Sequence, residues 1–231
     1  MPAAGNLLGG MIAVVSDVSQ RTLGLALHSA AGVALAVISV ELLPRVLQAD
    51  RPWMVIAAFV AGGGFFILID YSIDLVKSLT RTTEVSAASL AIFFGVAVDL
   101  FSDGAMIGAG STISFGLGLL LALGQVAGNL PAGFATIAAF ERKGMSAKRR
   151  LALTLSLSGV VFVGATLGYW LVRGQAEIMK LLLLGFTAGI LITVVVEEMI
   201  PEAHEGIDAR IATAVFVGSF ALFTLLSVYL D

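Results

Sequence analysis

Two aspartates lie in the middle of an otherwise apolar stretch of the sequence. Asp99 and Asp103 are four residues apart within residues 96–110, which contain no Lys or Arg. On a helix, this spacing puts both carboxylates on one face, about one turn apart. An acid at the centre of a bilayer costs about 2.5–3.5 kcal/mol on insertion scales, so acids retained there mark a functional site by default. Carboxylates without a fixed cationic partner are suited to a mobile cation or a proton.

A second polar stretch offers partners for this pair. Gln125 and Asn129 are also one helical turn apart, and both carry amide oxygens. Pro131 has no backbone N–H, so it can free a carbonyl near residue 127 from its helical hydrogen bond. A kinked helix beside two carboxylates can therefore form an oxygen-rich cation site. In the alternative interpretation, Pro131 only kinks the helix and the two amides bond across helices.

The composition identifies the surroundings of these residues as a membrane. Hydrophobic residues make up 58% of the 231 residues, charged residues make up 13%, and the mean hydropathy is +1.02. The apolar stretches run to about 20 residues or more, as membrane-spanning helices require, whereas barrel strands would alternate in polarity over about ten residues. We therefore predict an all-α polytopic membrane protein. Cysteine is absent, so any metal must be held by oxygen, imidazole or thioether donors.

Apolar runs between charged or turn-forming residues predict eight spans. Their ranges are 3–16, 21–46, 52–77, 85–109, 114–140, 149–173, 178–203 and 209–230. The first is short for a full crossing. The connections are brief and no low-complexity segment interrupts the chain, so we expect residues 1–231 to form a single transmembrane transporter domain.

The distribution of Lys and Arg predicts how the spans are oriented. Loops after the odd-numbered spans contain nine Lys and Arg, and those on the opposite side contain four. Because short cytoplasmic loops are enriched in these residues, the first set should be cytoplasmic and both termini should lie outside. The expected location is a cell membrane, either plasma or bacterial inner membrane. The expected partners are the lipid bilayer, a divalent cation and a second copy of the chain in a homodimer. The net charge of −3 gives no reason to expect nucleic acid.

Residues 30–44 resemble residues 187–201 when the two are aligned with a constant offset of 157. The alignment pairs Gly32 with Gly189, Glu41 with Glu198, and Pro44 with Pro201. These segments belong to the second and seventh spans, which cross the membrane in opposite directions. The pattern predicts inverted repeats, with spans 1–3 related to spans 6–8 and the polar fourth and fifth spans between them.

Three parts of the sequence resemble a known family: Asp99-Leu100-Phe101-Ser102-Asp103-Gly104, Gly128-Asn129-Leu130-Pro131-Ala132-Gly133, and the Glu-x-x-Pro endings at 41–44 and 198–201. They are similar to the ZIP (Zrt/Irt-like) family of divalent-metal transporters, and the resemblance covers nearly the whole chain. It implies eight helices in a 3+2+3 layout, outside termini, and metal ligands on the fourth and fifth helices. The family motifs there read approximately His-Asn-x-Pro-Glu-Gly and His-Glu-x-Pro-Glu-Gly.

On the fourth helix, the resemblance places Asp99 at the position of the family's His and Asp103 at that of its Glu. Leu100 stands in place of the Asn, and Ser102 in place of the Pro. The carboxylates of a metal site are therefore expected to remain, whereas its imidazole is replaced.

On the fifth helix, Gly128 stands for the family's His, Asn129 for the adjacent acid, and Ala132 for the Glu that would bridge two metals. The sixth helix contains no acid. These departures imply a single mononuclear site formed by Asp99, Asp103, Asn129 and Gln125, completed by a backbone carbonyl and water. Such a hard oxygen set suits Mn²⁺ or Fe²⁺ better than the family's Zn²⁺, and also admits Mg²⁺ or Ca²⁺.

A second group of polar residues is expected nearer the cytoplasmic side. The candidate inner pathway consists of Asp70, Asp74, Glu198, His28, Glu202 and His204. Asp70 and Asp74 are one turn apart and are the stronger candidates. The alternative for the two histidines is an interfacial or hydrogen-bonded role without metal.

The principal interpretation is a transporter rather than an enzyme, moving a divalent cation into the cytoplasm by alternating access. One alternative is a ZIP-fold protein without metal transport, acting as a proton-coupled carrier, a sensor or a partner subunit. Another is an unrelated transporter with an accidental repeat. An intramembrane aspartyl protease is disfavoured because Asp70-Tyr71 reverses the usual Tyr-Asp order and no Gly-x-Gly-Asp follows it.

Overall fold

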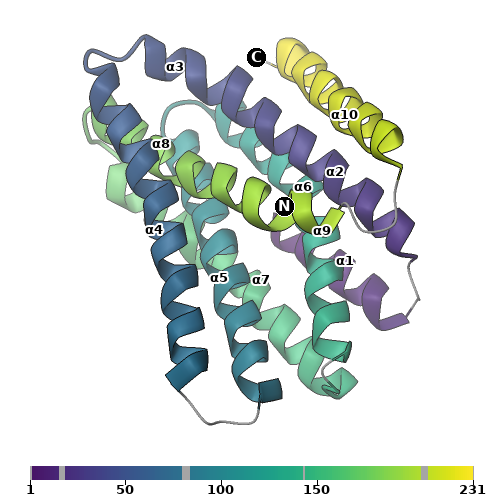
Figure 1. Ribbon diagram of the computed structural model, residues 1–231. Coiled ribbons are helices and arrows are strands. Elements are labelled where there is room, and N and C mark those ends of the chain that lie inside the picture. Colours follow the sequence, from purple (N-terminus) through teal and green to yellow (C-terminus); the bar gives the residue numbers. More distant parts are fainter. Residues whose placement is uncertain (1, 16–18, 80–83, 143, 204–207, 231) are drawn as a thin grey trace.

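A computed structural model of the protein describes residues 2–15, 19–79, 84–142, 144–203 and 208–230. Within these ranges every regular element is a helix and there is no strand. In chain order the elements are α1 (Pro2–Val15), α2 (Gln20–Ala36), the π-helix η1 (Val37–Leu42), α3 (Leu43–Leu47), α4 (Pro52–Leu79), α5 (Glu84–Ser111), α6 (Phe115–Arg142), α7 (Ala147–Val172), α8 (Glu177–Val194), the π-helix η2 (Val195–Met199), α9 (Ile200–Ala203) and α10 (Ala209–Leu230) (Figure 1).

These elements confirm the predicted all-α membrane fold. The second span consists of α2, η1 and α3, and the seventh consists of α8, η2 and α9. Seven spans in the described residues are long and apolar enough to cross a bilayer, and α1 is a shorter apolar helix of 14 residues. Only 17% of the most apolar window is buried in α4, and likewise in α10. Because apolar side chains cover these exposed faces, α4 and α10 contact lipid.

The spans pack as two groups of four. The first group is α1, α5, α6 and α7, in which α1 packs on α6 and α5 packs on α7. The second is α2, α4, α8 and α10, in which α4 packs on α8 and α10 lies along α2 (Figure 1). The groups meet where α2 contacts α6 and where α5 contacts α8. The contacts are symmetric if the first three spans are exchanged with the last three, and α5 with α6. The contact of α1 with α6 then becomes that of α7 with α5, the contact of α4 with α8 becomes that of α10 with α2, and the contact of α2 with α6 becomes that of α8 with α5.

The same exchange relates individual atoms, which confirms the inverted repeat. A Cβ added to Gly32 of α2 would overlap the carbonyl oxygen of Phe216 on α10. A Cβ added to Gly189 of α8 would overlap the carbonyl oxygen of Phe59 on α4. Both the glycines and the phenylalanines are 157 residues apart in sequence. The offset found in residues 30–44 therefore extends into the third and eighth spans.

The two π-helices lie at equivalent places in the repeats, each just before a proline. The N–H of Leu43 bonds to the carbonyl of Ile38, and that of Ile200 bonds to the carbonyl of Val195, five residues back in each case. Pro44 cannot donate a backbone hydrogen bond, and its ring crowds the carbonyl four residues earlier. A wider turn relieves this crowding, as π-bulges within α-helices do. The Glu-x-x-Pro endings thus have a structural role that the sequence pattern did not reveal.

Close helix contact in the first group depends on glycine. A Cβ on Gly104 or Gly108 of α5 would overlap a backbone carbonyl of α7, and one on Gly164 of α7 would overlap the carbonyl of Phe101 on α5. Small residues four apart allow helix backbones to approach closely in lipid, where van der Waals packing drives association. The helix carrying Asp99 and Asp103 is therefore held tightly on one side.

We expect Gly164→Leu to lower stability by about 1–3 kcal/mol or more, because the new side chain must separate α5 from α7. Gly159→Leu is the matched control on the same helix, since a Cβ there has no neighbour within 4 Å. Thermal unfolding of both variants in detergent measures the difference. Equal unfolding temperatures would contradict the close packing of α5 and α7.

Candidate metal site

The four residues expected to form the cation site are all buried, two on α5 and two on α6, and these helices pack on each other. Asp99, Asp103, Gln125 and Asn129 are 6%, 1%, 4% and 2% exposed, respectively. Each pair is four residues apart on its own helix, so each helix turns one polar edge inward, and α5 packs directly on α6. The structure joins Asp103 to Asn129, and the assembly of all four side chains into one cation site stays a prediction.

One hydrogen bond joins the two helices at the site. Asn129 Nδ2 donates to Asp103 Oδ2 over 2.9 Å. Asp103 Oδ1 and Asp99 Oδ1 are buried and have no hydrogen-bond partner among the described residues. A buried carboxylate oxygen without a donor is unfavourable, so it calls for a proton or a cation. The orphaned oxygens are the clearest sign of a ligand in this part of the molecule.

Gln125 has a different partner from the one expected. Its Nε2 lies 3.8 Å from the sulfur of Met106 and donates a weak hydrogen bond to it. Met106 is completely buried, in line with the packing role that methionines usually have. The thioether thereby fixes the amide of Gln125 through its nitrogen, and the amide oxygen remains the atom that can serve a cation.

There is space for a side chain at Gly128, the position where the family resemblance leads us to expect a His. A Cβ added to Gly128 would meet only Gln125 Oε1 and Met199 Cε, both at 3.9 Å. These are ordinary van der Waals distances. Met199, at the end of η2, therefore borders the site, a neighbour that sequence reasoning missed because it comes from the repeat.

Two further buried polar groups were not predicted. Ser102 Oγ and Asn6 Nδ2 both lack a hydrogen-bond partner among the described residues. Asn6 lies on α1, where its oxygens border the position of Gly133 on α6. The available signals were that Ser102 lies between the two aspartates and that Asn6 is the single polar residue of the first helix. Ser102 therefore adds an unsatisfied polar group within α5, and Asn6 adds one beside α6.

We expect Asn129→Ala to weaken cation binding about 10- to 100-fold, the usual cost of removing a group that orients a metal ligand. The substitution removes the donor that holds Asp103 Oδ2. Thr136→Ala, further along α6, is the control because its hydroxyl bonds to the carbonyl of Ala132 within its own helix. Calorimetric titration with Mn²⁺ measures both, and equal affinities would contradict the role of Asn129.

The inner-pathway candidates are only partly described. Asp70 on α4 and Glu198 on η2 are exposed, and Glu198 Oε1 lies 3.8 Å from where a Cβ of Gly95 would be. His28 is buried, and its Nδ1 lies 2.9 Å from the carbonyl oxygen of Gly24 in its own helix.

No three His, Asp or Glu side chains gather as a metal site among the residues with described positions. Asp74 and Glu202 belong to α4 and α9, but their side chains lie outside the description, as does the whole of His204. The inner pathway thus stays a prediction.

Comparison with known protein families identifies the family to which the chain belongs. The family model described as "ZIP Zinc transporter" matches residues 74–227, more than half of the chain. The chain belongs to the ZIP family. ZIP proteins transport divalent metals, and the matched range includes both α5 and α6 with the aspartate pair. A search of curated protein sequences gave no match. This ZIP protein is therefore an integral membrane protein of a metal-transporting family.

Proposed function

We propose that this ZIP protein moves a divalent cation toward the cytoplasm through a site between α5 and α6. The observation that carries the proposal is the pair of buried aspartates, Asp99 and Asp103, each with an oxygen that no described donor satisfies. A divalent cation would satisfy both carboxylates at once and would offset their mutual repulsion. Asn129 and Gln125 line the same contact and complete an oxygen-rich set.

The donor set favours Mn²⁺ or Fe²⁺ over Zn²⁺. Carboxylate and amide oxygens are hard ligands, and the imidazoles that suit Zn²⁺ are absent from the two motif helices. The sulfur of Met106, a soft donor near the pair, already accepts a weak hydrogen bond from Gln125. Zinc, the substrate that gives the family its description, is expected to bind more weakly than manganese or iron.

Alternating access is supported by the division into two groups of helices. The site lies in the group α1, α5, α6 and α7, and the other group contacts it through α2 and α8. Each of these helices is followed by a π-helix, and the two take equivalent positions in the inverted repeats. Rocking of one group against the other would expose the site to each side in turn, driven by ion gradients.

Uptake into proteoliposomes tests the proposal. Purified wild-type protein is expected to accumulate Mn²⁺ or Fe²⁺ down an imposed gradient, with saturation, and to bind the same ions in calorimetric titration. Empty liposomes are the control. Binding and uptake both absent for Mn²⁺, Fe²⁺, Zn²⁺ and Cd²⁺ would overturn the proposal.

The second candidate is a ZIP-fold protein that has lost metal transport. It is favoured by Gly128 and Ala132, which supply no donor where the family has a His and a bridging Glu. A proton-coupled carrier, a sensor or a partner subunit would then use the same fold. Saturable binding without uptake would indicate a sensor, whereas proton movement without metal binding would indicate a proton-coupled carrier.

A further inference from the structure

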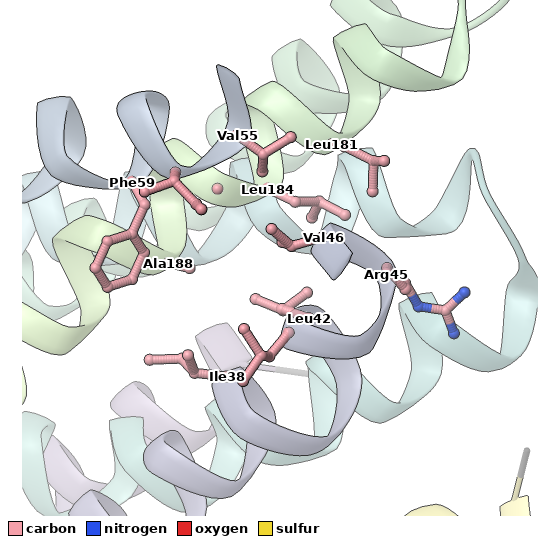
Figure 2. A pocket seen from close by; sticks show the side chains of 12 residues that line it. Ile38, Leu42, Arg45, Val46, Val55, Phe59, Leu181, Leu184 and Ala188 are labelled. Atoms are coloured by element: carbon pink, nitrogen blue, oxygen red, sulfur yellow. The ribbon is translucent and has the colours of Figure 1, made fainter. Parts of the chain in front are cut away.

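An apolar cavity of about 190 Å³ lies in the second group of helices, and none of the described residues that line it belongs to α5 or α6. Its walls come from η1, α3, α4 and α8, and include Leu42, Val46, Val55, Phe59, Leu184 and Ala188 (Figure 2). Leu43 and Ile56 at its rim are 48% and 53% exposed, so the cavity opens on the surface of the bundle. That surface continues along α4, whose exposed apolar face contacts lipid.

One charged residue, Arg45, lines both this apolar cavity and a neighbouring polar pocket. Arg45 lines the apolar cavity and, together with Leu181, also lines an adjoining pocket of about 300 Å³. Figure 2 shows the Arg45 guanidinium directed away from the apolar side chains. The second pocket also contains Gln48, Asp50 and Glu177. The two chambers together make an amphipathic site, apolar within the bundle and charged at its end.

Arg45 is held in place by a buried acid. Its Nε donates to the carbonyl oxygen of Glu41 over 3.1 Å, and its Nη2 lies 3.9 Å from Glu41 Oε2. Glu41 is itself buried, and Ser227 of α10 donates to its other carboxylate oxygen. A guanidinium has five N–H donors, so these contacts leave several for an anionic group in the polar chamber.

The charges in the polar chamber match a zwitterion. Arg45 suits a phosphate, because guanidinium groups bind phosphate oxygens with paired hydrogen bonds. Asp50 and Glu177 suit a primary ammonium, and they make the chamber net negative once Arg45 is counted. An anionic headgroup without an ammonium would give Asp50 and Glu177 no cationic partner, and the two carboxylates would repel it.

The polar chamber also has the right place along the bundle for a headgroup. It lies where α3 ends and α8 begins, and it includes part of the connection that leads from α3 to α4. Trp53, in the first turn of α4, is 67% exposed. Tryptophan at the end of a membrane span is typical of the membrane–water interface. A lipid in the bilayer would therefore bring its headgroup and acyl chain to the two chambers in register.

The geometry points to a binding site for one phosphatidylethanolamine molecule, its phosphate on Arg45, its ammonium on Asp50 and Glu177, and an acyl chain in the apolar cavity. The acyl chain gives little selectivity, because bilayer tails are as apolar as the cavity walls. Selectivity therefore comes from the headgroup, and the site distinguishes phosphatidylethanolamine from phosphatidylglycerol.

Lipid retention by the intact protein tests the headgroup part. Protein reconstituted in nanodiscs with equal amounts of phosphatidylethanolamine and phosphatidylglycerol is re-extracted, and its retained lipid is counted by native mass spectrometry. We expect about threefold enrichment of phosphatidylethanolamine, the size of effect that ion pairs at a wet surface give. Asp50→Asn combined with Glu177→Gln should abolish the enrichment, whereas Asp208→Asn, an exposed acid outside the chamber, should keep it. Retention of the two lipids in equal amounts by the wild type would overturn the proposal.

Substitutions that fill the apolar cavity test whether it binds an acyl chain. Val46→Phe places a ring in the apolar chamber and should lower lipid retention, whereas Val60→Phe, on the exposed face of α4 outside the cavity wall, should not. Unchanged unfolding temperatures show that both variants are folded. Equal retention by the two variants would contradict the site.

A single cysteine tests the competing occupant, a second copy of the chain. The protein has no cysteine, so Ile56→Cys at the rim of the cavity reacts alone. We expect it to be modified by a membrane-soluble thiol reagent and to form no disulfide dimer in the bilayer. Efficient disulfide dimers would place a second copy over the cavity and overturn the lipid assignment.

Discussion

Replacing Asp99 and Asp103 together by asparagine is expected to reduce cation uptake by about 100-fold or more, since losing even a group that orients a metal ligand costs about 10- to 100-fold. The change removes both negative charges while keeping the size of the side chains. Uptake of Mn²⁺ or Fe²⁺ into proteoliposomes measures the effect. Asp208→Asn, an exposed acid at the start of α10, is the control and should transport normally.

The same double variant should be at least as stable as the wild type. Asp99 Oδ1 and Asp103 Oδ1 are buried without partners, so their charges oppose folding unless a cation or proton compensates. A carboxamide carries no charge and avoids much of this cost. Thermal unfolding in metal-free buffer is therefore expected at an equal or higher temperature, which separates lost function from misfolding. Unaltered uptake by the folded variant would contradict a transport site at the aspartate pair.

Gly128→His is expected to strengthen Zn²⁺ binding roughly tenfold or more, an effect within the range that ligand-orienting groups already show in metal sites. It restores the imidazole of the family motif at a position where a Cβ makes only ordinary contacts. Imidazole is a donor that suits zinc better than the amide and carboxylate oxygens now present. The preference among metals should therefore move from Mn²⁺ toward Zn²⁺.

Gly159→His is the matched control for this gain. It adds the same side chain to α7 at a place where a Cβ has no neighbour within 4 Å, so it tests for nonspecific zinc binding. Parallel calorimetric titrations with Zn²⁺ and Mn²⁺ compare the two variants with the wild type. Equal zinc affinities for both histidine variants would show that Gly128 does not border the cation site.

The spans and the aspartate pair were predictable because each leaves a local mark in the sequence. Apolar runs of bilayer length end at charges or turns, and Asp99 and Asp103 interrupt such a run. The inverted repeat was visible because Gly32 and Gly189 are needed for the same close approach. The partners within the site were less accessible. The bonds from Asn129 to Asp103 and from Gln125 to Met106 depend on how α5 and α6 are rotated against each other.

Other features depend on contacts between distant parts of the chain. Asn6 reaches α6 because α1 packs there, and the approach of Met199 to Gly128 depends on the course of η2. A lone polar residue in a short apolar helix signals that it needs a partner but not which helix provides it, and a methionine in a long apolar helix gives no signal at all. The Arg45 site likewise needs the end of α3 to meet the start of α8, so no motif along the chain predicts it.

The paired π-helices make the second and seventh spans tolerant of changes in length at one place only. In an α-helix, one residue gained or lost turns everything beyond it by about 100°. A π-turn already holds one residue more than an α-turn, so losing that residue from η1 or η2 would restore α-helical hydrogen bonding without turning the flanking segments. Gly32 would keep facing α10, and Gly189 would keep facing α4. Natural single-residue deletions in these two spans should therefore concentrate just before positions 44 and 201, in sequences that have also lost the proline that the wider turn accommodates.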